Sequence, residues 1–144
     1  MVEVKLDKGV RGVRSIWVRQ VIESTLKLEK KKGAQVSVFL TGNKEIRRIN
    51  KRHLGHDYAT DVISFWMENE YLAESESKYL GDLAVSVEMA KNTAKELKIS
   101  FKEELARYLV HGTLHLLGYD DKKPKDRKKM HTKQENILTR ITKA

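Results

Sequence analysis

Two histidines and an aspartate in the last third of the chain have the spacing of ligands for one metal ion. His111 and His115 are four residues apart in a predicted helix, so their imidazoles project from the same face, one turn apart. Gly118 ends this helical pattern and lets the chain turn, so that the carboxylate of Asp121 can approach the same ion. Two histidines and one carboxylate leave a coordination position open for water, as in catalytic zinc sites. In the alternative interpretation, one histidine packs in the core, the other is exposed, and the Asp120–Asp121 pair only caps the next helix.

The residue after the first histidine argues against the most common enzymes with this pattern. Zinc peptidases carry a glutamate at that position, where it acts as the general base. Here the residue is Gly112, which cannot accept a proton, so the sequence disfavours peptide hydrolysis by that mechanism. We expect Gly112 to allow close helix–helix packing or to leave room beside the ion.

The elements that must position this site are a mixture of strands and helices. Alternating apolar residues predict strands over residues 2–6 and 36–40. The β-branched and aromatic residues of 62–66 predict a third strand, and residues 80–85 are expected to form a fourth. Helical periodicity and capping residues predict helices over residues 14–32, 43–52, 87–97, 100–117 and 124–141, with Gly33 ending the first helix and Asn43 and Ser100 capping the second and fourth. The acidic stretch that leads to Lys78 is expected to be an exposed loop. The pattern indicates one α+β domain over residues 1–144, in which about five helices pack on a mixed sheet of about four strands.

Composition narrows the possible chemistry. The 144 residues include no cysteine, which excludes disulfides, cysteine-ligated zinc, iron–sulfur clusters and a thiol nucleophile. Any metal must therefore be held by histidines and carboxylates. No apolar stretch is long enough to span a membrane, and the first residues do not resemble a secretory signal, so a cytoplasmic location is expected.

The formal net charge of +9 is unevenly distributed along the chain. Residues 1–50 and 122–144 each carry a net charge of +7, whereas residues 51–121 carry −5. Basic segments favour contact with phosphates, although lysine-rich surfaces also form solvated ion-pair networks in heat-stable proteins.

Several stretches of the sequence resemble the YbeY family of bacterial metal-dependent endoribonucleases. The segment His111-Gly-Thr-Leu-His115-Leu-Leu-Gly-Tyr-Asp120 is similar to the signature of this family. Shorter stretches that match other family motifs are Thr60-Asp-Val-Ile-Ser-Phe65, Leu80-Gly-Asp-Leu-Ala-Val85, Ile49-Asn50 and Glu104-Leu105. The resemblance spans about residues 34–140.

The resemblance implies an α+β fold with a metallopeptidase-like metal site and one Zn²⁺ near the end of the histidine helix. It further implies endonucleolytic cleavage of ribosomal RNA at the 3′ end of the small-subunit RNA, and a part in ribosome quality control. The implied partner is accordingly ribosomal RNA or the small ribosomal subunit, without membrane association.

Two positions depart from the family pattern in functional places. The family has a third histidine ligand where this chain has Asp121, and an anionic oxygen lowers the acidity that the ion confers on water. The family also has a functionally important arginine in the loop after Asn50, where this chain has Leu54. The nearest arginines are Arg52 and Arg48, and we take Arg52 as the candidate phosphate contact.

Three functions fit these observations. The first is a metal-dependent endoribonuclease that attacks RNA with metal-activated water. The second is a metal-dependent hydrolase of another substrate, and the third is a non-catalytic RNA- or ribosome-binding protein with a structural metal site. Asp61 and Asp82 are further candidates for a general base, although acids at strand ends more often cap or edge a sheet.

Overall fold

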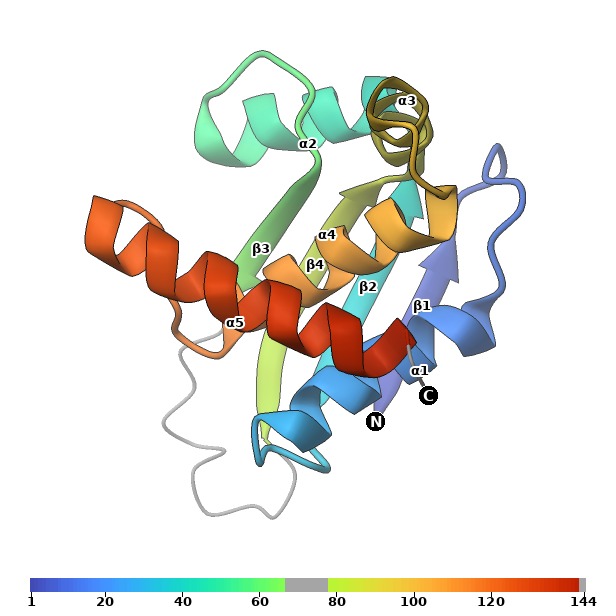
Figure 1. The fold of residues 1–144 in the computed structure, drawn as a ribbon. Helices are drawn as coiled ribbons and strands as arrows, with labels where there is room; N and C mark the ends of the chain where they lie inside the picture. Colours follow the sequence, from blue (N-terminus) through green and yellow to red (C-terminus); the bar gives the residue numbers. More distant parts are fainter. Residues whose placement is uncertain (67–77, 143–144) are drawn as a thin grey trace.

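The computed structural model describes residues 1–66 and 78–142. Nine elements follow in the order β1 (Val2–Leu6), α1 (Ser15–Leu28), β2 (Gln35–Thr41), α2 (Asn43–Leu54), β3 (Val62–Trp66), β4 (Tyr79–Ser86), α3 (Val87–Leu97), α4 (Phe101–Leu116) and α5 (Pro124–Thr142) (Figure 1). The predicted α+β class, with four strands and five helices in the described residues, is confirmed. The predicted acidic loop falls mainly on residues 67–77, which lie outside the described residues.

The four strands form one mixed sheet in the order β1-β2-β4-β3. The first three of these strands are mutually parallel, and β3 pairs antiparallel with β4 at one edge. Val38 of β2 lies between Val4 and Leu83 in the register, so the predicted apolar alternation of β2 is matched on both sides. The sheet therefore presents one continuous apolar face to the helices.

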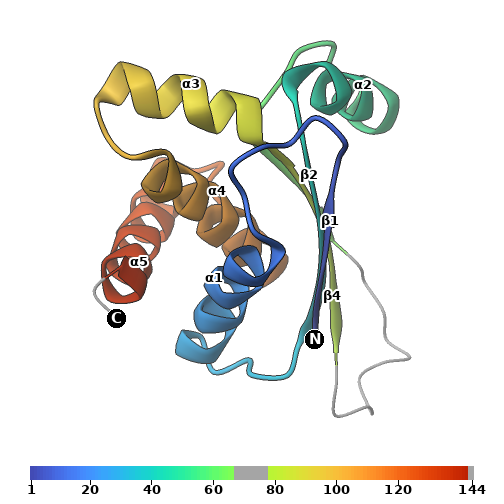
Figure 2. The same ribbon diagram turned by 90° about the vertical axis from the view of Figure 1, so that its right-hand side faces the viewer.

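The helices are divided unequally between the two faces of the sheet. Figure 2 shows α1, α3, α4 and α5 on one side of the strands and α2 against the other side, near one end. The main core lies on the first side, where fully buried Leu83, Leu109 and Leu114 belong to one cluster. On the other side, Ile46 of α2 forms a smaller cluster with Ile63 of β3 and Ala84 of β4. Within the described residues, no helix is long and apolar enough to cross a membrane.

Two helix boundaries differ from the sequence prediction for local reasons. Helix α1 ends at Leu28, not near Gly33, because Lys30 adopts a left-handed conformation with φ of 59°. The amide of Lys31 then donates to the carbonyl oxygen of Leu26 at 2.7 Å, which closes the helix. Helix α2 continues to Leu54, two residues beyond its predicted end at residue 52.

The predicted cap of α2 is wrong, whereas the predicted cap of α4 is confirmed. Gly42 is the N-cap of α2, and Asn43 is its first helical residue. The exposed amide of Asn43 donates to the carboxylate of Glu88 in α3 at 2.9 Å, so another helix supplies the capping acceptor. At the start of α4, the hydroxyl oxygen of Ser100 accepts from the amide of Glu103 at 3.1 Å.

Candidate metal centre

Gly112 allows helix α4 to pack directly against the sheet, because it has no side chain at the point of contact. A Cβ atom at this position would lie 2.9 Å from Cδ2 of Leu83 and 2.9 Å from Cγ2 of Val62. The hydroxyl of Ser64 in β3 donates to the carbonyl oxygen of Gly112 at 3.1 Å, which fixes the helix against the edge strand. The expected close packing is therefore present, but it joins a helix to two strands and not to another helix.

The structure brings together the three side chains that the spacing predicted as ligands. One ligand atom from each of His111, His115 and Asp121 lies within 4.8 Å of the other two. The two Nε2 atoms are 3.1 Å apart, and Oδ2 of Asp121 lies 3.6 Å from Nε2 of His111 and 3.3 Å from Nε2 of His115. Ligands at zinc–ligand distances of about 2.0–2.1 Å in a tetrahedral site are about 3.4 Å apart. The triangle of donor atoms therefore has the size that a zinc ion requires.

The other nitrogen of each imidazole has an acceptor that determines the tautomer. Nδ1 of His111 lies 2.7 Å from Oε1 of Gln134, and Nδ1 of His115 lies 2.9 Å from the main-chain oxygen of Tyr119. Each Nδ1 therefore carries a proton, so that each imidazole in its neutral form presents a lone pair at Nε2. Two lone pairs and a carboxylate oxygen thus face one another, an arrangement that a cation stabilises. These residues fit a divalent metal ion.

The amide of Gln134 is itself held in one orientation by α4 and α5. Its Nε2 donates to the carboxylate of Glu135 at 3.0 Å, which leaves Oε1 directed at His111. Glu135 in turn receives two hydrogen bonds from Arg107, from Nε at 3.0 Å and from Nη2 at 3.1 Å. The hydrogen bond with Glu135 is the main cause that raises the pKa of Arg107, and it lowers the pKa of Glu135. Both groups are therefore charged near neutral pH, and the chain of contacts ends at His111.

A second set of contacts holds the loop between α4 and α5. The hydroxyl of Tyr119 donates to Glu29, at the end of α1, at 2.6 Å. Lys133 of α5 lies 3.4 Å from the other oxygen of the same carboxylate. Tyr119, whose main-chain oxygen orients His115, is thus attached to α1 through its own side chain.

Sequence reasoning missed Gln134, Glu135 and Arg107. A signal for Gln134 was present, because this polar residue interrupts the apolar stripe of Met130, Ile137 and Leu138 and is only 6% exposed. A buried amide in such a stripe needs hydrogen-bond partners, which points to a polar neighbour on the facing helix. The pairing with Arg107 depends on how α4 and α5 dock, and no local pattern encodes it.

Comparisons with known proteins identify the family of the chain. The family model described as "Endoribonuclease YbeY" matches residues 8–142. The chain belongs to this family. Among YbeY relatives, the endoribonuclease of Bacillus licheniformis is 46% identical over 114 residues, which cover 75% of this chain and 72% of the relative. That of Aquifex aeolicus is 38% identical over 142 residues, covering 98% of this chain and 91% of the relative.

A solved structure shares the YbeY fold seen here. The solution structure of TM1509 from Thermotoga maritima superposes with a TM-score of 0.69 and 27% sequence identity. The match covers 98% of this chain and 89% of that chain.

Among the described residues, none of the remaining sequence candidates forms a hydrogen bond or ion pair with the three ligand side chains. Leu54, at the position of the family arginine, ends α2 and is 50% exposed. Arg52 is exposed in the last turn of the same helix, and the described residues show no hydrogen bond or ion pair for its side chain. Asp82 pairs with the hydroxyl of Tyr79 and points away from α4, because its neighbour Leu83 faces that helix.

Asp61 has a capping role in the described structure. Its Oδ1 accepts from the amide of Val62 at 2.7 Å and from the hydroxyl of Thr60 at 3.2 Å. Its main-chain oxygen accepts from the amide of Ser86 at 2.8 Å. These contacts hold the beginning of β3 against the end of β4.

Proposed function

We propose that this chain is a metal-dependent endoribonuclease that hydrolyses single-stranded RNA with Zn²⁺ held by His111, His115 and Asp121. The observation that carries the proposal is the convergence of three metal-ligating side chains, two of which, the histidines, are oriented by hydrogen bonds at Nδ1. Membership of a family described by its endoribonuclease activity supports RNA as the substrate. The proposed physiological substrate is ribosomal RNA at the 3′ end of the small-subunit RNA, in the cytoplasm.

The ion would supply Lewis-acid contact with a phosphoryl oxygen and would lower the pKa of water. The chain itself orients both imidazoles, since Gln134 and the main-chain oxygen of Tyr119 each accept a hydrogen bond from an Nδ1. Asp121 adds one negative charge, which reduces the net charge of a bound ion relative to three imidazoles. Gly112 offers no side chain for proton transfer, which disfavours the mechanism of zinc peptidases.

The deciding experiment is RNA cleavage with added Zn²⁺ by the wild-type protein and by His111→Ala. We expect the wild type to cut a single-stranded ribosomal RNA fragment and His111→Ala to lose the activity. Circular dichroism of both proteins controls for folding. Unchanged cleavage by a folded His111→Ala protein would contradict the metal mechanism.

Metal analysis separates a catalytic site from the other readings of the sequence. We expect one ion per chain in the wild type and a large loss in Asp121→Ala. Tight RNA binding with a full complement of metal but no cleavage would instead support a non-catalytic RNA-binding protein. Hydrolysis of a non-RNA ester with no RNA cleavage would support a hydrolase of another substrate.

A further inference from the structure

One exposed arginine is attached directly to the loop that carries the third proposed ligand. Nε of Arg127 donates to the main-chain oxygen of Asp121 at 3.1 Å, and its Nη2 donates to that of Lys122 at 3.4 Å. The amide of Arg127 also donates to the oxygen of Lys123 at 2.8 Å, in the first turn of α5. The guanidinium is thus held against the loop of Asp121 by main-chain oxygens, and these contacts do not depend on the side chains of the loop.

The charge of this guanidinium has no carboxylate partner among residues 1–66 and 78–142. Arg107 and Arg47 differ in this respect, since Arg107 contacts three glutamates and Arg47 contacts Asp57 at 2.8 Å. Two of the five guanidinium N–H donors of Arg127 bind main-chain oxygens, and within the described parts of the chain no acceptor occupies the other three. An anchored guanidinium with free donors is suited to a phosphate, because little side-chain entropy remains to be lost on binding.

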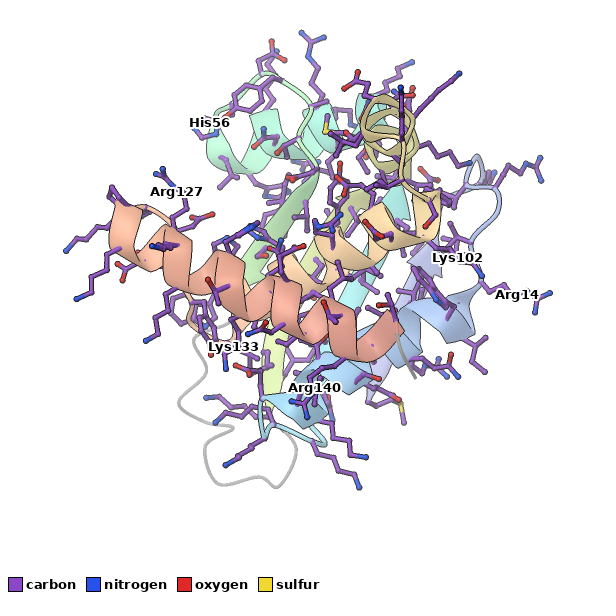
Figure 3. All side chains as sticks on the ribbon, viewed as in Figure 1. Arg14, His56, Lys102, Arg127, Lys133 and Arg140 are labelled. Atoms are coloured by element: carbon purple, nitrogen blue, oxygen red, sulfur yellow. The ribbon has the colours of Figure 1, made fainter. Side chains whose placement is uncertain are left out.

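The side chain of Arg127 lies on the same side of the molecule as the segment that follows α2. In Figure 3, Arg127 projects from the first turns of α5 toward the side where His56 follows the end of α2. That is the connection in which the family has its arginine and this chain has the apolar, half-exposed Leu54. No arginine from α2 contacts the ligand loop in the described structure, whereas Arg127 contacts it twice.

We propose that Arg127 binds a non-bridging oxygen of the RNA phosphodiester at the metal centre, and so supplies from α5 the guanidinium that Leu54 cannot supply. This inference rests on the proposed endoribonuclease function. A fixed donor at this place stabilises the negative charge that increases on the phosphoryl oxygens during hydrolysis. Arg127 is thereby a substrate-binding residue, distinct from the groups that hold the metal.

The test compares Arg127→Met with Arg140→Met, which removes the same charge from the last turn of the same helix (Figure 3). We expect Arg127→Met to lower kcat/KM for a single-stranded RNA about 100-fold and Arg140→Met to leave it within about threefold. Arg127→Lys should recover part of the loss, since it restores the charge without the planar fork. Without metal, Arg127→Met should bind the same RNA about tenfold more weakly than the metal-free wild type, as measured by fluorescence anisotropy.

Metal content distinguishes substrate binding from a merely structural role. We expect Arg127→Met to retain the wild-type stoichiometry of zinc, and loss of the ion would overturn the proposal by showing that Arg127 only holds the Asp121 loop. Equal effects of Arg127→Met and Arg140→Met would also overturn it, while wild-type cleavage would still support the endoribonuclease function. A wild-type protein that cuts no RNA would contradict that function and this inference with it.

Discussion

The orientation of His111 depends on a single buried side chain, the amide of Gln134. Metal ligands of this type lose about 10- to 100-fold in metal affinity when the acceptor of their second nitrogen is removed. We therefore expect Gln134→Leu to lower zinc affinity by this factor, as measured by competition with a chelating dye. Gln134→Glu keeps an acceptor for Nδ1 and should retain most of the affinity.

The control for this prediction is Asn136→Leu, at an exposed position of the same helix. This variant should bind zinc as the wild type does. Equal affinities of Gln134→Leu and Asn136→Leu would show that Gln134 does not position His111.

At the scale of residues, the ligand set could be predicted because its members are close in sequence. A four-residue helical spacing determines that two side chains share a face, and a terminating glycine brings Asp121 back to the same place. Gln134, Glu135 and Arg107 could not be assigned to the site in this way. Their roles depend on the docking of α5 against α4, which adds long-range information to the local pattern.

At the scale of elements, the contact of α4 with β3 and β4 leaves no room for a residue larger than glycine at position 112. Gly112→Ala would place a methyl group 2.9 Å from side-chain carbons of both Leu83 and Val62. We expect the substitution to reduce the free energy of unfolding by about 1–3 kcal/mol, as measured by urea denaturation. Gly9→Ala is the matched control, since a Cβ there has no atom within 4 Å. A Gly112→Ala protein as stable as Gly9→Ala would show that the helix can move away from the sheet without cost.

The ion pair between α4 and α5 predicts a dependence of stability on pH. The hydrogen bond from Arg107 lowers the pKa of Glu135 below its ordinary value of 4.5. A carboxyl whose pKa is lowered in the folded state stabilises the fold above its ordinary pKa, and this contribution is lost as the pH falls through the folded-state value.

We therefore expect the wild type to lose stability more steeply than Glu135→Gln between about pH 5 and pH 3. Urea denaturation at a series of pH values measures this difference. Parallel curves for the two proteins would contradict a stabilising role for the pair.

The elements themselves were largely predictable, and each of the errors has a specific structural cause. Strands β1 and β2 follow from the alternation of apolar and polar residues, and α5 follows from a periodic apolar stripe. Strand β4 is buried on both faces, because Leu83 and Ala84 belong to clusters on opposite sides of the sheet. The end of α1 was wrong because a lysine, not the later glycine, takes the left-handed position. The cap of α2 was wrong because Glu88, 45 residues further along the chain, supplies the acceptor.

At the scale of the whole molecule, the basic start of α5 lies beside the acidic segment that contains the site. Lys122, Lys123 and Lys125 are exposed there. Replacing all three by glutamine should weaken RNA binding and lower the slope of log affinity against log salt by about two, with metal content unchanged. Binding of a labelled RNA at several salt concentrations measures the slope.

The matched control replaces Lys95, Lys98 and Lys102, which are exposed on α3, at its C-cap and at the start of α4. In Figure 3, Lys102 lies on the side of the molecule opposite Arg127. This variant has the same net charge and should retain the wild-type slope. Equal slopes for the two triple variants would show that the total charge, and not its position, determines RNA binding.

The contact of Tyr119 with Glu29 also affects when the centre can form during synthesis of the chain. The three ligands and Gln134 all lie between positions 111 and 134. The connection between α4 and α5 is anchored to the end of α1 through Tyr119. While α5 is still within the ribosome, His111 has no acceptor for its second nitrogen, even if the sheet and α1 have already folded. Capture of the ion in its final geometry therefore requires that α5 has emerged from the ribosome and docked on α4.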